Sequence, residues 1–309
     1  MILVNAIIIP LALILDRIIG DPRSRFHPVV LIGQVIGWWG RPAVWQGNLQ
    51  RAAGVVMWFC TVFLFSLPFF IVGHYLPWFL LLIIGPVLLK FCLAWRSLEE
   101  HTLSVSEGIT RNIDDGRREV AKMVSRKTGD LNDEQVLSAA YESMAENLVD
   151  SIISPIFYFA IFGLVGAAVF RAANTMDAML GYHDEREHIG WFSAKMDDLF
   201  NFIPARITGV LLILYFTAKG RFLPAYEALK RDRKKRPGLN GGIPMAVIAG
   251  GTGIKFEKPG VYVMGTGERS LREGGAEIIA AVRAVTLIFT FTVMMVLILL
   301  GSGTIYTGI

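Results

Sequence analysis

The stretch Glu142–Asp177 decides the fold, and its sequence is ESMAENLVDSIISPIFYFAIFGLVGAAVFRAANTMD. At its centre lies Ile152–Phe170, a run of 19 uncharged residues. A helix of that length covers roughly 30 Å, the thickness of a bilayer core. Carboxylate and carboxamide side chains crowd both ends of the run. Such groups are costly to remove from water, so their concentration beside a lipid-length segment indicates a functional site as well as a membrane helix.

Further apolar runs indicate an integral membrane protein. The chain of 309 residues is 53% hydrophobic and 18% charged, whereas about 25% is usual for a soluble domain. We therefore predict an all-α fold: a polytopic integral-membrane helical bundle of about five to six spans with cytoplasmic helical loops, forming one domain over residues 1–309 of a multi-pass protein of the cell membrane. The other runs are Ile2–Leu15, Ala52–Val72, Pro77–Leu89, Ile203–Thr217 and Ile278–Leu300.

The first run, Ile2–Leu15, is short and contains Asn5 and Pro10. It lacks a basic segment and a small-residue cleavage site, so we interpret it as a retained first helix and not as a removable signal peptide.

Polar residues are collected in three segments, 96–151, 171–206 and 218–277, which we expect to form the site region. Lys230–Arg236 (KRDRKKR) is the densest basic run. Beside a membrane helix, we interpret it as an anchor near anionic lipid headgroups and expect no nucleic-acid partner. Positive charge is concentrated in three regions, and we therefore expect these regions to face the cytoplasm. They are Arg17–Arg51, Lys90–Lys127 and Lys219–Arg272.

If the spans alternate in direction, residues 171–206 lie on the outer side of the membrane. Their carboxylates, however, look suited to form one site with the carboxylates before Ile152, which lie on the cytoplasmic side. Two explanations are open. Ile152–Phe170 could be a broken or re-entrant pair of half-helices, which Pro155, Gly163 and Gly166 would permit, or the site could be recessed within the bundle. We favour a recessed site between helices, open to the cytoplasm.

A stripe of carboxylates is expected on the helix Glu134–Asp150, which Asn132 and Asp133 open. Glu142, Glu146 and Asp150 lie at positions i, i+4 and i+8, and therefore along one side of that helix. Neither Lys nor Arg occurs between Lys127 and Arg171 to neutralise them. A bound cation or a substrate amine would explain the stripe, and Mg²⁺, which takes one or two carboxylates plus phosphate oxygens, is the natural candidate.

A second polar cluster follows the central run. Asn174 and Asp177 share a helical face at i and i+3, and Asp197, Asp198 and Asn201 form another group. Pro204 is expected to break the helix before Arg206. The glycines of Gly250–Gly253 are only a weak phosphate-binding signal, because no complete phosphate-loop motif surrounds them.

Several long motifs in one order resemble the cobalamin-biosynthesis CobD/CbiB family, the membrane-bound adenosylcobinamide-phosphate synthases. NTMDAM stands where the family pattern suggests NTLDSM, an exchange that keeps the Asn and the Asp. The motifs are DRIIGDP…HPV at Asp16–Val29, ESMAENLVDSIISP at Glu142–Pro155, AANTMDAMLGY at Ala172–Tyr182, GWFSAKMDDLFNFIPAR at Gly190–Arg206, and the stretch Asn240–Gly265 ending in EKPGVYVMG.

The resemblance implies amide-bond formation in cobalamin biosynthesis. The family joins adenosylcobyric acid, through its free propionate carboxyl, to aminopropanol or its O-phosphate, with ATP as the driver. Activation of a carboxylate by Mg²⁺-ATP requires metal-binding carboxylates, phosphate-binding arginines and a base for the amine. The expected partners are this corrinoid, the amino alcohol and membrane lipid, and a homo-oligomer is possible.

We assign roles on this hypothesis by chemical type. Asp197 and Asp198 are expected to serve both metal binding and amine deprotonation, and His27 could instead be a helix-capping or structural histidine. The catalytic set is Glu142, Glu146, Asp198 and His27; the substrate- and phosphate-binding set is Arg17, Arg23, Arg171, Arg206, Asn147, Asn174 and Asn201; and the metal set is Asp150, Asp177 and Asp197.

Two other classes of function compete with the ligase. A membrane transporter could use carboxylates to couple a cation or a proton, but it would need inverted repeats, which the sequence lacks, and polar residues spread through the spans. A membrane sensor that has lost catalysis would be expected to lose carboxylates, and here they are intact.

Overall fold

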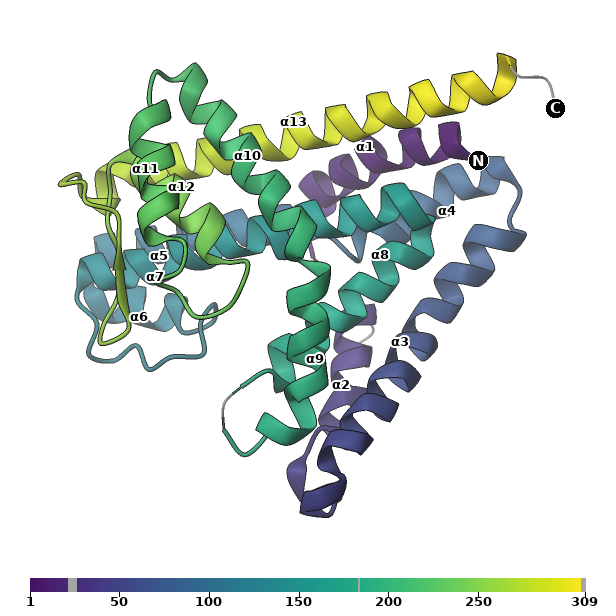
Figure 1. Ribbon diagram of the computed structural model, residues 1–309, viewed down its shortest axis with the longest axis horizontal. Coiled ribbons are helices and arrows are strands. Elements are labelled where there is room, and N and C mark those ends of the chain that lie inside the picture. Colours follow the sequence, from purple (N-terminus) through teal and green to yellow (C-terminus); the bar gives the residue numbers. More distant parts are fainter. Residues whose placement is uncertain (22–26, 183, 307–309) are drawn as a thin grey trace. The chain divides into compact units, whose positions relative to one another are not determined.

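The computed structural model describes residues 1–21, 27–182 and 184–306, and these residues are mostly helical (Figure 1). Among them, five helical stretches are long and apolar enough to cross a membrane, and a sixth is reached if α9 and α10 form one span. The prediction of an all-α bundle with five to six spans is confirmed. The chain divides into two compact units, each built from separate pieces of sequence.

The first unit comprises residues 1–94, 154–201 and 290–309. Its core joins Ile36 and Trp58 to Met176 and Ile189, so side chains from distant parts of the sequence pack together. Its helices are α1 (Ile2–Ile19), α2 (Pro28–Trp39), α3 (Gln50–Tyr75), α4 (Trp78–Lys90), α8 (Ser154–Leu180), α9 (Glu187–Phe200) and the end of α13 (Leu271–Tyr306).

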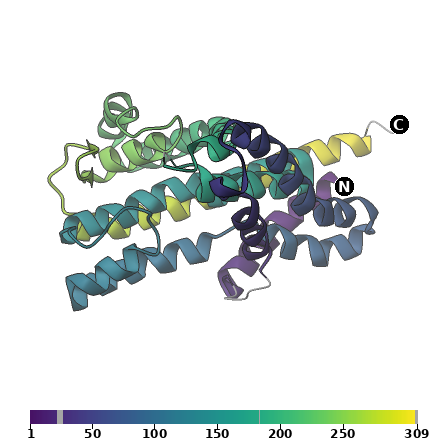
Figure 2. The same cartoon turned by 90° about the horizontal axis from the view of Figure 1, so that it is seen from below.

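The second unit comprises residues 95–153 and 202–289. It also contains the strands β1 (Phe256–Lys258) and β2 (Tyr262–Met264), an antiparallel pair in which Phe256 lies opposite Met264 and which is drawn as two short arrows in Figure 2. Its helices are α5 (Trp95–Arg111), α6 (Ile113–Val120), α7 (Asp133–Leu148), α10 (Phe202–Ala218), α11 (Phe222–Asp232), α12 (Gly242–Thr252) and the first part of α13.

Helix α7 begins where its capping residues predict. The Asn132 side chain accepts a hydrogen bond from the Gln135 backbone N–H at 2.9 Å, and the Gln135 side chain accepts one from the Asn132 N–H at 3.1 Å. This reciprocal capping box satisfies two N–H groups that the first turn would otherwise leave unpaired. A π-helical turn, Val149–Ile153, then leads into α8.

The central apolar run is interrupted at Gly163. Its backbone has φ 62° and ψ −153° inside α8, a conformation that is open to glycine and strained for residues with a Cβ. The sequence left two explanations open, a broken helix and a recessed site. The backbone conformation of Gly163 supports a break in the helix. Pro155 does not cause the break, since it lies in the first turn of α8, where no backbone N–H is needed.

The break between α9 and α10 differs from the prediction. We expected Pro204 to end a helix before Arg206, but α9 ends at Phe200 and α10 begins at Phe202. Pro204 is therefore in the first turn of α10, a position that tolerates proline, and Arg206 lies inside the helix.

Candidate functional site

Glu142 is the most enclosed acid of the predicted stripe, with 5% of its surface exposed. Its Oε2 accepts hydrogen bonds from the phenol of Tyr262 at 2.8 Å and from Nη2 of Arg126 at 3.3 Å. Its Oε1 accepts one from the hydroxyl of Ser138, one turn earlier on α7. The buried carboxylate is thus held in one orientation by three donors.

Glu146 is neutralised by Arg236, with which it forms an ion pair through Nε and Oε1. Burial lowers the pKa of Arg236, but the charges of Glu146 and Asp150 outweigh it, so the net pKa is raised. Gly241 permits this packing, since a Cβ there would lie 2.8 Å from both Arg236 and Glu146. The stripe therefore does have counter-charges, Arg126 and Arg236, which come from outside the interval Lys127–Arg171.

The basic run Lys230–Arg236 also serves the interior of the second unit. Asp232 is fully buried, and it pairs with Arg231 at 2.7 Å and with Lys235 at 2.9 Å. Burial would raise the pKa of Asp232, but hydrogen bonds from these cations and from the Gly265 N–H hold it at about 2. Three cations of the run thus pair with carboxylates, and a role as a lipid anchor stays a prediction for the others.

The β1–β2 hairpin brings Tyr262 to α7. Gln135 donates to the Glu257 carboxylate at 2.9 Å, and the Glu257 N–H donates to the Ser138 hydroxyl at 2.7 Å. Burial, followed by the nearby Glu142 charge, raises the pKa of Tyr262, so its phenol stays protonated and remains a donor. Tyr262 is not among the predicted site residues, although it lies in the motif EKPGVYVMG.

Two predicted amide- or phosphate-binding residues in the second unit have partners within it. Asn147 donates to the Ser143 carbonyl at 2.9 Å and accepts from the Ser151 hydroxyl at 3.0 Å. Arg206 donates to Asn240 Oδ1 at 2.8 Å and stacks over the Phe202 ring.

In the first unit, the structure brings Asn174, Asp197 and Asn201 together. Asp197 Oδ1 accepts from the Asn174 amide at 3.1 Å, and its Oδ2 accepts from the Asn201 amide at 3.0 Å. The Ser154 hydroxyl in turn donates to Asn201 Oδ1 at 2.6 Å. The amides of Asn174 and Asn201 thus orient Asp197, and the Ser154 hydroxyl orients Asn201.

Asp198 lines a pocket of about 340 Å³ in the first unit. Cations and anions line it together with the aromatic ring of Trp191. Its size is at the small end of ligand pockets. Its charged residues are Arg51, Glu187, Lys195 and Asp198, of which only Asp198 belongs to the predicted set. Asp177 is not one of the lining residues, but it packs closely against one of them, Gly181, near the end of α8.

His27 caps a helix, as one of the two interpretations of it anticipated. Its Nδ1 accepts from the Val29 N–H at 3.3 Å at the start of α2. Burial lowers the pKa of His27, with Lys90 and Arg171 acting in the same direction and Asp21 opposing them. Arg171 thus lies within electrostatic reach of His27, Arg17 lies exposed near the end of α1, and Arg23 falls outside the described residues.

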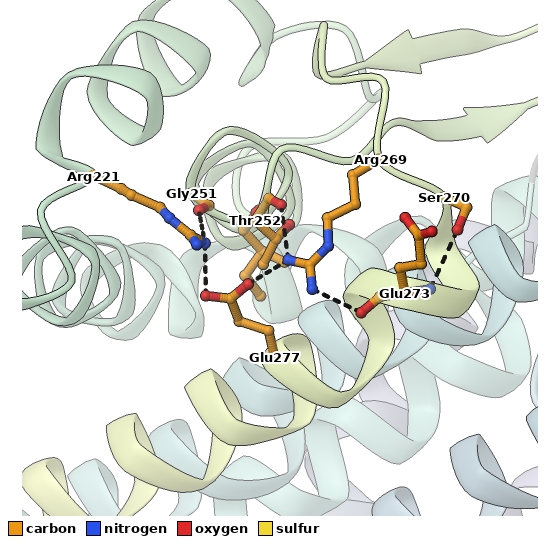
Figure 3. A network of polar contacts seen from close by, with 8 residues as sticks. Arg221, Gly251, Thr252, Arg269, Ser270, Glu273 and Glu277 are labelled. Carbon is orange, nitrogen blue, oxygen red and sulfur yellow. Dashed lines mark hydrogen bonds and ion pairs between the residues drawn. The ribbon is translucent and has the colours of Figure 1, made fainter.

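The glycine-rich stretch ends a helix and does not present backbone N–H groups to a phosphate. Gly253 closes α12 in the left-handed conformation, φ 74°. Figure 3 shows Arg221 and Arg269 bound to opposite oxygens of Glu277 and to the carbonyls of Gly251 and Thr252. Arginines at the C-terminal carbonyls complement the helix dipole, so this network stabilises the end of α12.

The residues expected to hold Mg²⁺ are distributed over both units: Asp150 lies in the second, and Asp177 and Asp197 lie in the first. Among the described residues, no group of three or more His, Cys, Asp or Glu side chains is arranged to hold a metal. Mg²⁺ bound with a nucleotide needs only one or two carboxylates, because phosphates and water complete its shell. The oriented carboxylate of Asp197 fits that requirement, and metal binding stays a prediction.

Comparison with known proteins agrees with the resemblance in the motifs. The family described as "CobD/Cbib protein" matches residues 9–300. A "Probable cobalamin biosynthesis protein CobD" of Methanothermobacter thermautotrophicus is 42% identical over 82% of this chain and 85% of its own. One from Thermococcus kodakarensis is 40% identical over 95% of both chains, and the "Cobalamin biosynthesis protein CobD" of Dehalococcoides mccartyi is 35% identical over 84% of this chain and 87% of its own.

No solved structure matches the chain. The family match covers nearly all of the sequence, including both carboxylate clusters and the hairpin that carries Tyr262. This chain is therefore a member of the CobD/CbiB family.

Proposed function

We propose that this chain acts in cobalamin biosynthesis as an ATP-dependent ligase of the cell membrane. It condenses the free propionate carboxyl of adenosylcobyric acid with the amine of aminopropanol or its O-phosphate, which gives adenosylcobinamide or its phosphate. The observation that carries this proposal is the family match over residues 9–300, which includes every described residue of the predicted site. The names of the relatives support the pathway, and the reaction itself is our proposal.

The amine must lose a proton before or as it attacks the carboxyl carbon, so the site needs an oriented base. Glu142 suits this role because it is enclosed and held by Tyr262, Ser138 and Arg126. Glu146, one turn further along α7, is paired with Arg236 and would contribute charge balance. We therefore rank Glu142 above Glu146 as the base.

Asp197 is our first choice for the metal, with Asp198 beside it in sequence. Asn174 and Asn201 donate hydrogen bonds to both oxygens of Asp197 and so fix its orientation, as the partners of a metal-binding carboxylate commonly do. When bound, Mg²⁺-ATP would activate the carboxyl group for substitution.

The proposal is tested with the purified full chain in detergent, mixed with adenosylcobyric acid, Mg²⁺-ATP and either aminopropanol or aminopropanol phosphate. Mass spectrometry of the corrinoid should show the mass gain of an amide condensation, and the gain should vanish without ATP. Comparison of the two amines identifies the donor. Protein that is folded and binds the corrinoid but gives no gain with either amine would refute the ligase.

The same preparation addresses the transporter alternative. Carboxylates can couple cation transport, but transport requires net passage across a sealed membrane. Protein in proteoliposomes that moves a cation or a proton, and that leaves the corrinoid chemically unchanged, would favour that alternative.

A further inference from the structure

Lys90 is a buried cation outside the predicted site. It is the only charged residue of α4, whose sequence is WFLLLIIGPVLLK, and it is 4% exposed. Its Nζ lies 2.6 Å from Oδ1 of Asp21. An ionisable side chain in or beside a membrane segment is costly to bury, so its retention points to a function that includes its partners.

His27 directs a second donor to the same carboxylate region. Because its Nδ1 accepts the Val29 N–H, a neutral imidazole carries its proton on Nε2. That atom is 3.8 Å from Asp21 Oδ1, beyond hydrogen-bond distance, and it is buried without a hydrogen-bond partner. The ring is fixed by its capping bond and by an edge-on contact with Phe91, so this N–H is held in place with nothing to bind.

Arg171 supplies a further donor. It follows the apolar run of α8, and its Nε is also buried without a hydrogen-bond partner. The charges of both Arg171 and Lys90 act on the His27 imidazole, which places all three groups in one electrostatic neighbourhood. Asp21 pairs with Lys90, so His27 Nε2 and Arg171 Nε remain as buried donors without an acceptor.

We propose that Lys90, Arg171 and the Nε2–H of His27 form a binding site for an oxyanion, either a phosphate group or a carboxylate, in the first unit. Buried donors that lack acceptors are costly unless a ligand satisfies them, and an oxyanion would accept from His27 Nε2 and Arg171 Nε beside the Lys90 cation. Asp21 holds Lys90 in place and competes with the ligand for it. Identification of the oxyanion as a reacting carboxyl or phosphate group rests on the proposed function. The proposal that an oxyanion binds here does not.

If the Lys90–Asp21 ion pair is purely structural, the expected effect of Asp21→Asn on anion binding is different. If the pair only stabilises the fold, Asp21→Asn and Lys90→Met should both destabilise the protein, and neither should alter its response to anions. If an oxyanion binds, Asp21→Asn removes a competitor and should strengthen binding, while loss of Lys90 should weaken it. The signs of the two effects therefore distinguish the alternatives.

The experiment measures the thermal midpoint of the full chain in detergent as chloride is replaced by inorganic phosphate, or by acetate, at constant ionic strength. A ligand that binds only the folded state raises the midpoint in proportion to its occupancy. We expect Asp21→Asn to bind phosphate more tightly than wild type, and the double variant Asp21→Asn/Lys90→Met to bind at least about tenfold more weakly than Asp21→Asn. The double variant removes both charges together, so it leaves no unpaired ion that could prevent folding.

Lys219→Met, at an exposed lysine, controls for the general stabilisation that phosphate gives to proteins, and it should respond as wild type does. Responses to phosphate alone or to both anions support the site and identify its ligand class. The proposal is overturned if the double variant keeps the response of Asp21→Asn, or if Asp21→Asn responds no more strongly than wild type. No corrinoid or ATP is present, so this result is independent of the ligase assay.

Discussion

The two carboxylate clusters are stabilised by different kinds of partner. In the second unit, Glu142 and Glu146 pair with the cations Arg126 and Arg236. In the first unit, Asp197 is held by the neutral amides of Asn174 and Asn201. An arginine orients a carboxylate and offsets its charge, whereas an amide orients it through a hydrogen bond alone. On the proposed function, the first cluster would hold the cation and the second would supply the base.

The largest effect is expected from a substitution of Glu142. We expect Glu142→Gln to lower kcat of the condensation by about 10²–10⁴-fold, since a glutamine keeps the shape but cannot accept a proton. Steady-state rates from the mass-spectrometric assay measure this effect. Glu107→Gln, at an exposed acid on α5, is the matched control and should keep the wild-type rate. Full turnover by a folded Glu142→Gln protein would remove Glu142 from catalysis.

The assignment of the cation to the first cluster can be tested by two matched variants. We expect Asp197→Asn to raise the Mg²⁺ concentration required for half-maximal rate by at least about tenfold. Asp150→Asn, in the second unit, should change it less. Titration of the rate with Mg²⁺ at saturating ATP measures both, and a larger effect at Asp150 would move the metal to the second cluster.

Charge pairing in the second cluster should be visible in stability. Arg236→Met leaves the partly enclosed Glu146 without its cation, so we expect the free energy of unfolding to fall by about 2 kcal/mol, between the values for exposed and buried pairs. Glu146→Gln in the same chain should restore part of the loss. Unfolding midpoints in detergent test this, and a double variant no more stable than Arg236→Met would argue against the pair.

The smallest effect is expected where neutral donors are removed. Asn174→Ala deletes one hydrogen bond from an uncharged amide to Asp197, so we expect a loss of about 1 kcal/mol that does not depend on salt. Arg236→Met should instead lose less stability at high salt, because screening weakens the interaction it removes. Unfolding in low and high KCl separates the two. A strong salt dependence for Asn174→Ala would contradict the contrast between the clusters.

The sequence was sufficient to predict the spans, because a lipid-length apolar run has few alternatives to a helix. It did not predict α2 (Pro28–Trp39), whose 12 residues are too short to stand out as a span. The sequence also left the role of Gly250–Gly253 open, since glycines that close a helix and glycines that bind phosphate look alike without their neighbours.

The site was harder to predict than the fold for a physical reason. The stripe at Glu142 and Glu146 was identified correctly as a set of carboxylates on one helix. However, the absence of nearby Lys or Arg suggested an unmet need for a cation, although Arg236 and Tyr262 arrive from about a hundred residues away. Short-range spacing shows which side chains share a helical face. It does not show which distant side chains fold onto them.

The way each unit is assembled has a consequence for synthesis in the cell. Trp58 in the first piece of the first unit packs with Ile189, and residues 290–309 also belong to that unit. At translation rates of about 5–20 residues per second, residues 1–94 wait roughly 5–20 s for residues 154–201 to be made. The first helices are therefore inserted before their packing partners exist. The order of assembly cannot follow the order of synthesis, and insertion factors that shield these helices would be expected to influence the yield of folded protein.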